Sequence, residues 1–133
     1  MQNRLYFALL MLLSLSIQCS DNSNTAELTP EEILQKDEEL GQKEKEIIAF
    51  ITAYKCSPGG CGFMAFGSKP CGGPWKYIVY PKSIDVDKLT QMVTAYNELQ
   101  HQYNLQTNAV SDCMFVGPPT EVVCVNGVCT IVK

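Results

Sequence analysis

The chain has 133 residues, of which 46% are hydrophobic and 18% are charged, and its ten basic residues are outnumbered by fourteen acidic ones. This length leaves room for one domain. The only arginine is Arg4, and after residue 18 nine lysines face fourteen acidic residues, a formal charge of −5. Because nucleic-acid binding draws its affinity from basic patches, this balance excludes nucleic acid as the expected partner.

Residues 5–17 form an apolar stretch that follows a basic start at Arg4. Thirteen helical residues reach about 20 Å, short of the ~30 Å hydrocarbon core of a membrane. A basic start, a short apolar stretch and a polar continuation are typical of a secretory signal peptide. An uncleaved anchor helix is the alternative, and it would need a longer apolar stretch. We therefore interpret residues 1–18 as an export signal.

Cys19 stands at the end of this stretch, where no suitable pair of small residues marks a cut by the usual signal peptidase. The sequence Leu15-Ser16-Ile17-Gln18-Cys19 resembles the lipobox of bacterial lipoproteins, in which the cysteine is acylated and becomes the new N-terminus. It departs from the common pattern at Ser16 and Gln18 and is similar to the looser boxes of the Bacteroidota. The resemblance implies a lipid on Cys19 and a place in the cell envelope, at the outer membrane, on its periplasmic face or on the cell surface. A cysteine that lies there by chance is the alternative.

Lipidation of Cys19 would leave six cysteines in a mature chain of 115 residues. Beyond an oxidising boundary, six cysteines predict three disulfides. Of the fifteen pairings that six cysteines allow, we favour Cys56–Cys71, Cys113–Cys124 and Cys61–Cys129. Zinc is the alternative, since two C-x4-C pairs could supply four thiolates. The expected compartment favours disulfides, so we predict no metal and no cofactor.

Residues 19–28 are polar and acidic, and we expect them to form a flexible tether before a single domain at residues 29–133. Thr29, Pro30 and Glu32 predict a capped helix start, and the helix should run to about Tyr54. Eight of the fourteen acidic residues fall between residues 27 and 46, without the spacing of an EF-hand, and indicate a solvated face rather than a calcium site. The apolar face of this helix comprises Ile33, Leu40, Ile47, Ile51 and Tyr54.

The rest of the chain alternates strands and one more helix. Apolar pieces at 63–66 and 77–80 predict two strands joined by a long loop, and a helix from about residue 86 to 103 should be capped by Asp85 or Ser83. Asn126-Gly127 between two β-branched runs predicts a hairpin, and residues 110–116 are a candidate for a further strand. The predicted fold class is α+β, with two amphipathic helices packed on a small antiparallel sheet and stapled by three disulfides.

Catalytic residues are not apparent. His101 is the only histidine, and it falls opposite the apolar stripe of the second helix. A catalytic triad needs a base that a third group orients, and an exposed histidine between two glutamines offers no such setting. No particular pair of carboxylates stands out. We therefore expect no enzyme.

The densest motif lies at residues 67–77 and combines glycines, prolines, a cysteine and the only tryptophan. Rigid loops with an aromatic anchor lose little entropy on binding, which makes this a candidate binding loop. The alternative, which we favour, is structural: the glycines supply special backbone angles and Trp75 fills the core of a small domain. The residues of the candidate loop are Ser68, Lys69, Pro70, Gly72, Gly73 and Trp75.

Three parts of the sequence together resemble a group of small secreted proteins and lipoproteins of the Bacteroidota. They are residues 67–80 (GSKPCGGPWKYIVY), the Ser111-Asp112-Cys113 motif and the hairpin sequence at 123–127. That group has no settled activity, so the resemblance implies no catalytic residues. We expect a lipid-anchored monomer that binds a protein partner or supports the envelope without catalysis. The alternative is a protease inhibitor that presents a disulfide-braced loop, although Lys69 followed by Pro70 is an awkward bond for a protease.

Overall fold

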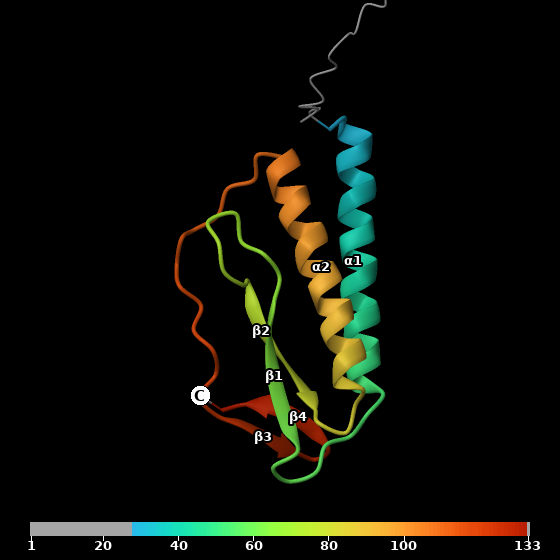
Figure 1. Ribbon diagram of the computed structural model, residues 1–133, viewed down its shortest axis with the longest axis vertical. Helices are drawn as coiled ribbons and strands as arrows, with labels where there is room; N and C mark the ends of the chain where they lie inside the picture. The colour runs from blue at the N-terminus through green and yellow to red at the C-terminus, as the bar shows by residue number, and fades with distance from the viewer. Residues whose placement is uncertain (1–27, 133) are drawn as a thin grey trace, which may run out of the picture.

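The computed structural model describes residues 28–132 of the chain. Two helices and two antiparallel hairpins make up these residues, and this confirms the predicted α+β class. No helix within the described range is long and apolar enough to cross a membrane. The elements follow in the order α1 (Pro30–Thr52), β1 (Cys61–Phe66), β2 (Lys76–Pro81), α2 (Val86–Gln106), β3 (Val122–Val125) and β4 (Val128–Ile131) (Figure 1).

Both helices begin where the sequence predicts. At the start of α1 the Thr29 N–H donates to Glu32 Oε2 at 2.8 Å and the Glu32 N–H donates to Thr29 Oγ1 at 3.3 Å, which is a complete capping box. The hydrogen bond from the Thr29 backbone lowers the pKa of the Glu32 carboxyl, and the Thr29 hydroxyl adds to this effect. Of the two candidate caps for α2 it is Asp85 that accepts the Lys88 N–H, at 2.9 Å.

The hydrophobic core lies between the helices and one face of the β1–β2 sheet. Helices α1 and α2 run antiparallel and side by side along the sheet (Figure 1). Phe66 of β1 stacks on Tyr96 of α2 with 4.4 Å between ring centroids. The predicted apolar face of α1 is buried at its centre and C-terminal half, whereas Tyr54 lies beyond the helix end and is exposed. The core residues are Leu40, Ile47, Ile51, Phe66, Ile78, Ile84, Leu89, Val93 and Tyr96.

Strands β3 and β4 form the predicted hairpin, with Cys124 opposite Cys129 in the register. Asn126 (φ 52°) and Gly127 (φ 81°) both occupy the left-handed region that a type I′ turn requires. The candidate strand at 110–116 is wrong, because this part of the chain contains no β-ladder. Its residues run past the β1–β2 hairpin without pairing to a strand, and they are held instead by side-chain contacts and a disulfide to the loop between β1 and β2.

Three disulfides join the six cysteines, and this prediction is confirmed. Two of the three favoured pairings are wrong, since the bonds are Cys56–Cys124, Cys71–Cys113 and, as predicted, Cys61–Cys129. The hairpin register explains the correction. Because Cys124 and Cys129 lie opposite each other, both side chains project from one face of the hairpin, and each bonds to one member of the other C-x4-C pair.

Candidate functional site

The loop at residues 67–75, which the sequence offered as a candidate binding loop, is fixed along α2 by three side chains on one face of that helix. Asn97 Oδ1 accepts the Gly67 N–H at 2.7 Å, and Gln100 Oε1 accepts the Ser68 N–H at 2.7 Å. One turn further on, Asn104 Nδ2 donates to the Ser68 carbonyl, also at 2.7 Å. The polar groups at the start of this loop are therefore satisfied within the domain.

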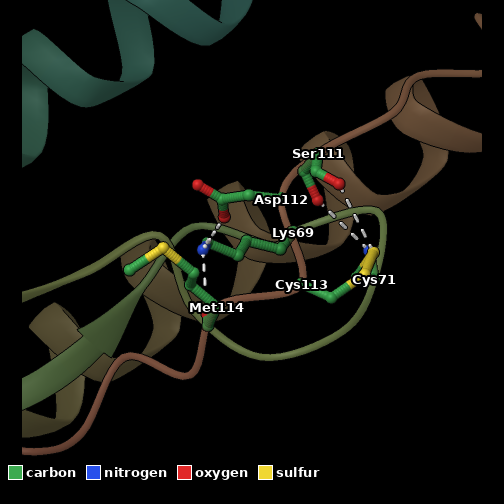
Figure 2. Close-up of a disulfide and its surroundings, with 6 residues drawn as sticks. All are labelled: Lys69, Cys71, Ser111, Asp112, Cys113 and Met114. Carbon is green, nitrogen blue, oxygen red and sulfur yellow. Dashed lines mark hydrogen bonds and ion pairs between the residues drawn. A yellow bond between two sulfur atoms is a disulfide. The ribbon is translucent and has the colours of Figure 1, made fainter.

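Lys69 is the buried cation of the loop, with only 5% of its surface exposed. Its ammonium donates to Asp112 Oδ1 at 2.7 Å and to the Met114 carbonyl at 3.1 Å (Figure 2). The same nitrogen lies 5.1 Å from the centroid of the Trp75 ring, within range of a cation–π interaction. The hydrogen bond from Lys69 lowers the pKa of the Asp112 carboxyl, and the positive charge of Lys69 adds to this effect. Lys69 thus holds segment 107–121 against the loop.

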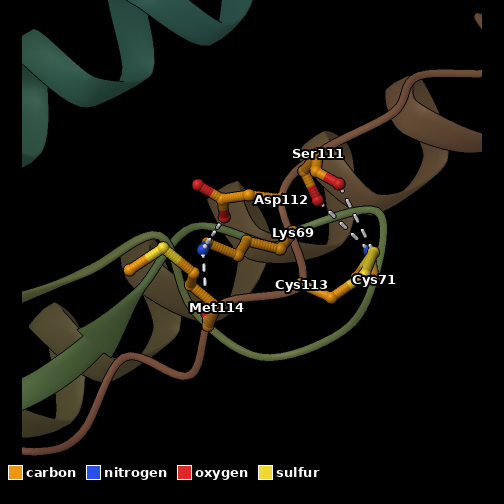
Figure 3. Close-up of polar contacts among 6 residues, drawn as sticks. All are labelled: Lys69, Cys71, Ser111, Asp112, Cys113 and Met114. Atoms are coloured by element: carbon orange, nitrogen blue, oxygen red, sulfur yellow. Dashed lines mark hydrogen bonds and ion pairs between the residues drawn. A yellow bond between two sulfur atoms is a disulfide. The ribbon is translucent and has the colours of Figure 1, made fainter.

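A disulfide holds the same two segments together on the other side of the lysine. Cys71 is bonded to Cys113, and the Cys71 nitrogen lies 3.5 Å from Ser111 Oγ (Figure 3). The Lys69 N–H donates to the Gly73 carbonyl and the Gly72 N–H donates to the Lys69 carbonyl, both at 2.9 Å. Gly72 and Gly73 adopt positive φ angles of 92° and 79°, a conformation that glycine adopts without strain, so this tight turn favours glycine.

These contacts account for the dense motif as a structural feature. The prediction that Trp75 fills the core is wrong, because 41% of its surface is exposed and it does not belong to the core cluster. Its ring covers the loop instead, beside Gly67, where an added Cβ would lie 2.9 Å from Trp75 Cδ1. Pro70 is half-buried, and the turn at Cys71, Gly72 and Gly73 is exposed.

A second surface, which the sequence did not single out, is an apolar groove of about 420 Å³. This volume lies within the ~300–1,000 Å³ of typical ligand pockets. Three segments form its walls: the end of α1, strand β2 and the turn of the β3–β4 hairpin. We call it the edge groove. Its walls comprise Ile48, Ile51, Thr52, Tyr54 and Lys55, then Lys76, Tyr77, Ile78, Val79 and Pro81, and then Asn126, Gly127, Val128 and Cys129.

The edge groove follows the free edge of β2. Five of the six residues of β2 line it and none of β1 does, although the two strands are paired along their whole length. The groove therefore lies on the side of β2 that faces away from β1. Both strands belong to a two-stranded sheet, so in the described part of the chain β2 has no second neighbour in its ladder.

The register shows which backbone groups of β2 reach this edge. The Lys82 N–H donates to the Gly60 carbonyl at 2.7 Å, just outside the Cys61↔Pro81 pair. Because hydrogen-bonded and non-hydrogen-bonded pairs alternate in an antiparallel ladder, Phe63↔Val79 and Ala65↔Tyr77 are non-hydrogen-bonded pairs. The N–H and C=O groups of Tyr77 and Val79 therefore point away from β1 and towards the edge groove.

The charges at the edge groove are positive. Among the described residues that line it, Lys55 and Lys76 are the only ionisable ones apart from the two tyrosines, and none is a carboxylate. Lys76 Nζ is 2.7 Å from Glu44 Oε1, an ion pair at the groove margin in which the lysine is half exposed. Lys55 lies over the hairpin turn, where its side chain is within 3.3 Å of the position that a Cβ on Gly127 would take.

The remaining predicted residues lie elsewhere. His101 is exposed on α2, as expected, beside a shallow hollow that Pro70 also lines. The sulfurs of Cys56, Cys61 and Cys124 gather within 4.8 Å of one another, the grouping that a zinc site would need. All three are bonded in disulfides, and a disulfide sulfur lacks the thiolate that zinc requires. Cys19 lies outside the described residues, as do residues 1–18 and most of the tether.

Comparison of the chain with protein-family models, with curated proteins and with solved structures found no match. The resemblance to small Bacteroidota lipoproteins therefore stays a prediction from the sequence motifs.

Proposed function

We propose that this chain is the precursor of a lipoprotein of the cell envelope, anchored through acylated Cys19, whose disulfide-braced domain binds a partner without catalysis. The observation that supports binding is the edge groove, an open apolar hollow of about 420 Å³. The polar groups of loop 67–75, the other candidate surface, are bonded within the domain. In the part of the chain that the structure describes, the walls of the groove offer apolar contacts and two lysines but neither a histidine nor a carboxylate. Such a surface is suited to binding.

The position of the edge groove supports this proposal. The tether would join the domain just before Pro30, and α1 extends about 33 Å from Pro30 to Thr52. The groove is formed beside the last turn of α1. This turn lies at the opposite end of the helix from Pro30 (Figure 1). An attachment through residue 19 would therefore reach the domain at the end of α1 opposite to the groove.

The disulfides support the envelope part of the proposal. The six cysteines after Cys19 pair among themselves, and disulfides persist in oxidising compartments outside the cytoplasm. The inhibitor alternative finds no support in the loop, because Lys69 is buried against Asp112 and could not enter the pocket of a protease. Binding at the edge groove is the function that the geometry favours.

Mass spectrometry of the full-length protein from a membrane fraction tests the anchor. We expect an N-terminus at a diacylated or triacylated Cys19 and three intact disulfides, and we expect Cys19→Ala to move the protein out of the membrane fraction. A water-soluble product that still starts at Met1 would refute the anchor. The binding part is tested by the experiment that closes the next subsection.

A further inference from the structure

We infer that the edge groove is a receptor for an extended peptide, which adds to the free edge of β2 as a third strand and places acidic groups beside Lys55 and Lys76. This inference rests on the proposed binding function and names the chemistry of the partner. Strand addition to an exposed sheet edge is a recurring mode of peptide recognition, in which main-chain hydrogen bonds give affinity and the flanking hollows give specificity.

The backbone of β2 is the first reason to expect a peptide. Tyr77 and Val79 direct their N–H and C=O groups into the groove, where apolar walls from Ile48, Ile51 and Val128 surround them. A purely apolar ligand would remove these four groups from water without replacing their hydrogen bonds, and a buried polar group without a partner is unfavourable. A peptide strand would pair all four. The edge of β2 is therefore matched to another backbone.

The length of the groove also fits a strand. The β2 residues that line it span Lys76–Pro81, about 17 Å at 3.4 Å per residue. A partner strand of five or six residues would cover this distance. Pro81 closes one end, since it has no N–H to offer to a ladder.

The charge of the groove indicates which peptide would bind. Lys55 and Lys76 lie along its walls, and within residues 28–132 no lining residue is acidic. Lys76 shares its charge with Glu44, whereas Lys55 forms no ion pair with any described residue. An acidic side chain or a terminal carboxylate of the peptide would therefore meet Lys55 first and Lys76 second, and a basic peptide would be repelled. The half-buried side chains of Tyr77 and Val79 lie on the outer face of the sheet, where apolar residues of the incoming strand would contact them. We therefore expect a peptide in which apolar residues alternate with polar ones and which carries acidic groups.

A second copy of this chain would not fit. The edge of β2 is recessed between the end of α1 and the hairpin turn. A second β2 strand is flanked by the same two walls, so edge-to-edge pairing of two folded copies would bring the walls of one copy against those of the other. A free peptide has no such walls.

The test uses the full-length lipoprotein in lipid nanodiscs and an array of synthetic ten-residue peptides. In every peptide apolar and polar residues alternate, and half of the peptides contain two aspartates where the other half contain two lysines. We expect the aspartate peptides to be retained in preference to the lysine peptides. Equal retention of the two sets, or a preference for lysine, would overturn the inference.

Proline variants then locate the bound strand. Val79→Pro removes an outward N–H from the groove edge of the sheet and should weaken peptide binding by at least about 30-fold. Ala65→Pro makes the same change on the opposite edge, at β1, and should leave the affinity within about twofold, as should Val79→Thr, which keeps the N–H and the side-chain shape. Equal binding by Val79→Pro and the unchanged protein would overturn the inference. Each variant is first checked for three disulfides.

Should Val79→Pro fail to fold, the change is made in the peptide. N-methylation of the alternate amides that face β2 should abolish binding, and N-methylation of the other amides should not. Equal effects of the two methylation patterns would overturn strand addition.

Hexanoate and phenylacetate are tested in parallel by the NMR shifts of the Val79 and Val128 amides. If these small acids bind and no peptide does, strand addition is refuted and the proposed binding function of the groove is kept. If nothing binds, both proposals are refuted.

Discussion

Loop 67–75 and the edge groove are two exposed parts of one small domain that use their backbone groups in opposite ways. In the loop, Gly67, Ser68 and Lys69 all direct their backbone N–H groups to partners within the domain. In the groove, Tyr77 and Val79 of the adjoining strand direct theirs towards open space. The loop, which has the unusual composition, is therefore the region whose backbone hydrogen bonds are made within the domain. The edge groove, which has backbone groups left to bind a partner, consists of ordinary strand and helix residues.

Removing disulfides should have the largest effect on stability and should separate the loop from the groove. Replacing Cys61 and Cys129 by serine, or Cys71 and Cys113 by serine, releases loops of 68 and 42 residues and should cost about 4 kcal/mol of unfolding free energy in each case. Only the first pair anchors the hairpin turn that forms one wall of the groove. We therefore expect urea unfolding to be similarly affected in both variants and peptide binding to fall only in the first. A loss of binding in the second variant would show that the loop and the groove are not independent.

Glycine replacements sharpen the account of the loop. Gly67 and Gly72 both have positive φ, of 83° and 92°. A Cβ at Gly67 would lie 2.8 Å from Gln100 Oε1 and 2.9 Å from Trp75 Cδ1, whereas a Cβ at Gly72 would meet nothing within 4 Å. Gly67→Ala should therefore cost about 3 kcal/mol and Gly72→Ala about 1 kcal/mol, measured by urea unfolding. Equal costs would mean that the loop is not packed against α2 as described.

Two lysines provide a matched pair, one from each region. Lys69→Met removes the charged donor to Asp112 and to the Met114 carbonyl and should lower the unfolding free energy by about 2 kcal/mol. Lys76→Met removes a partly exposed ion pair with Glu44 and should change stability by less than about 1 kcal/mol. Titration calorimetry with an aspartate peptide should show the reverse order, with weaker binding only for Lys76→Met. Weaker binding by Lys69→Met alone would indicate that loop 67–75, and not the edge groove, contacts the peptide.

The smallest expected effect is a dependence on acid. The hydrogen bond from Lys69 lowers the pKa of Asp112 in the folded protein, so this contact stabilises the fold above the unfolded pKa of about 3.9. That stabilisation is lost as the pH falls through the lower, folded pKa. The difference in unfolding free energy between the unchanged protein and Lys69→Met should therefore shrink between pH 5 and pH 2. A difference that stays constant over this range would show that Asp112 does not take part.

Local patterns account for what the sequence could predict. The capping box at Thr29, the turn at Asn126-Gly127 and the helical periodicities are decided by residues within a few positions of one another, and each was placed correctly. The pairings of Cys56 with Cys124 and of Cys71 with Cys113 depend on how the hairpins meet in space, and spacing along the chain does not encode this.

The same limit explains why the edge groove was missed. Its walls come from three segments that lie far apart in the sequence. A strand at residues 77–80 was predicted, but no local pattern shows which of its edges stays unpaired. Trp75 was assigned to the core because small domains usually bury their largest side chains, yet its ring covers a buried lysine at the surface instead. Burial of Lys69 could have been suspected only from the acidic Asp112 more than 40 residues away.

Amide hydrogen exchange of the full-length protein, with and without a retained aspartate peptide, reports whether the edge of β2 receives another strand. We expect the peptide to slow exchange at Tyr77 and Val79 by at least about 100-fold, since both amides would gain a strand partner. The Lys69 and Gly72 amides, already bonded within the loop, should exchange at unchanged rates. Slowed exchange in the loop with no change at Tyr77 and Val79 would contradict the account.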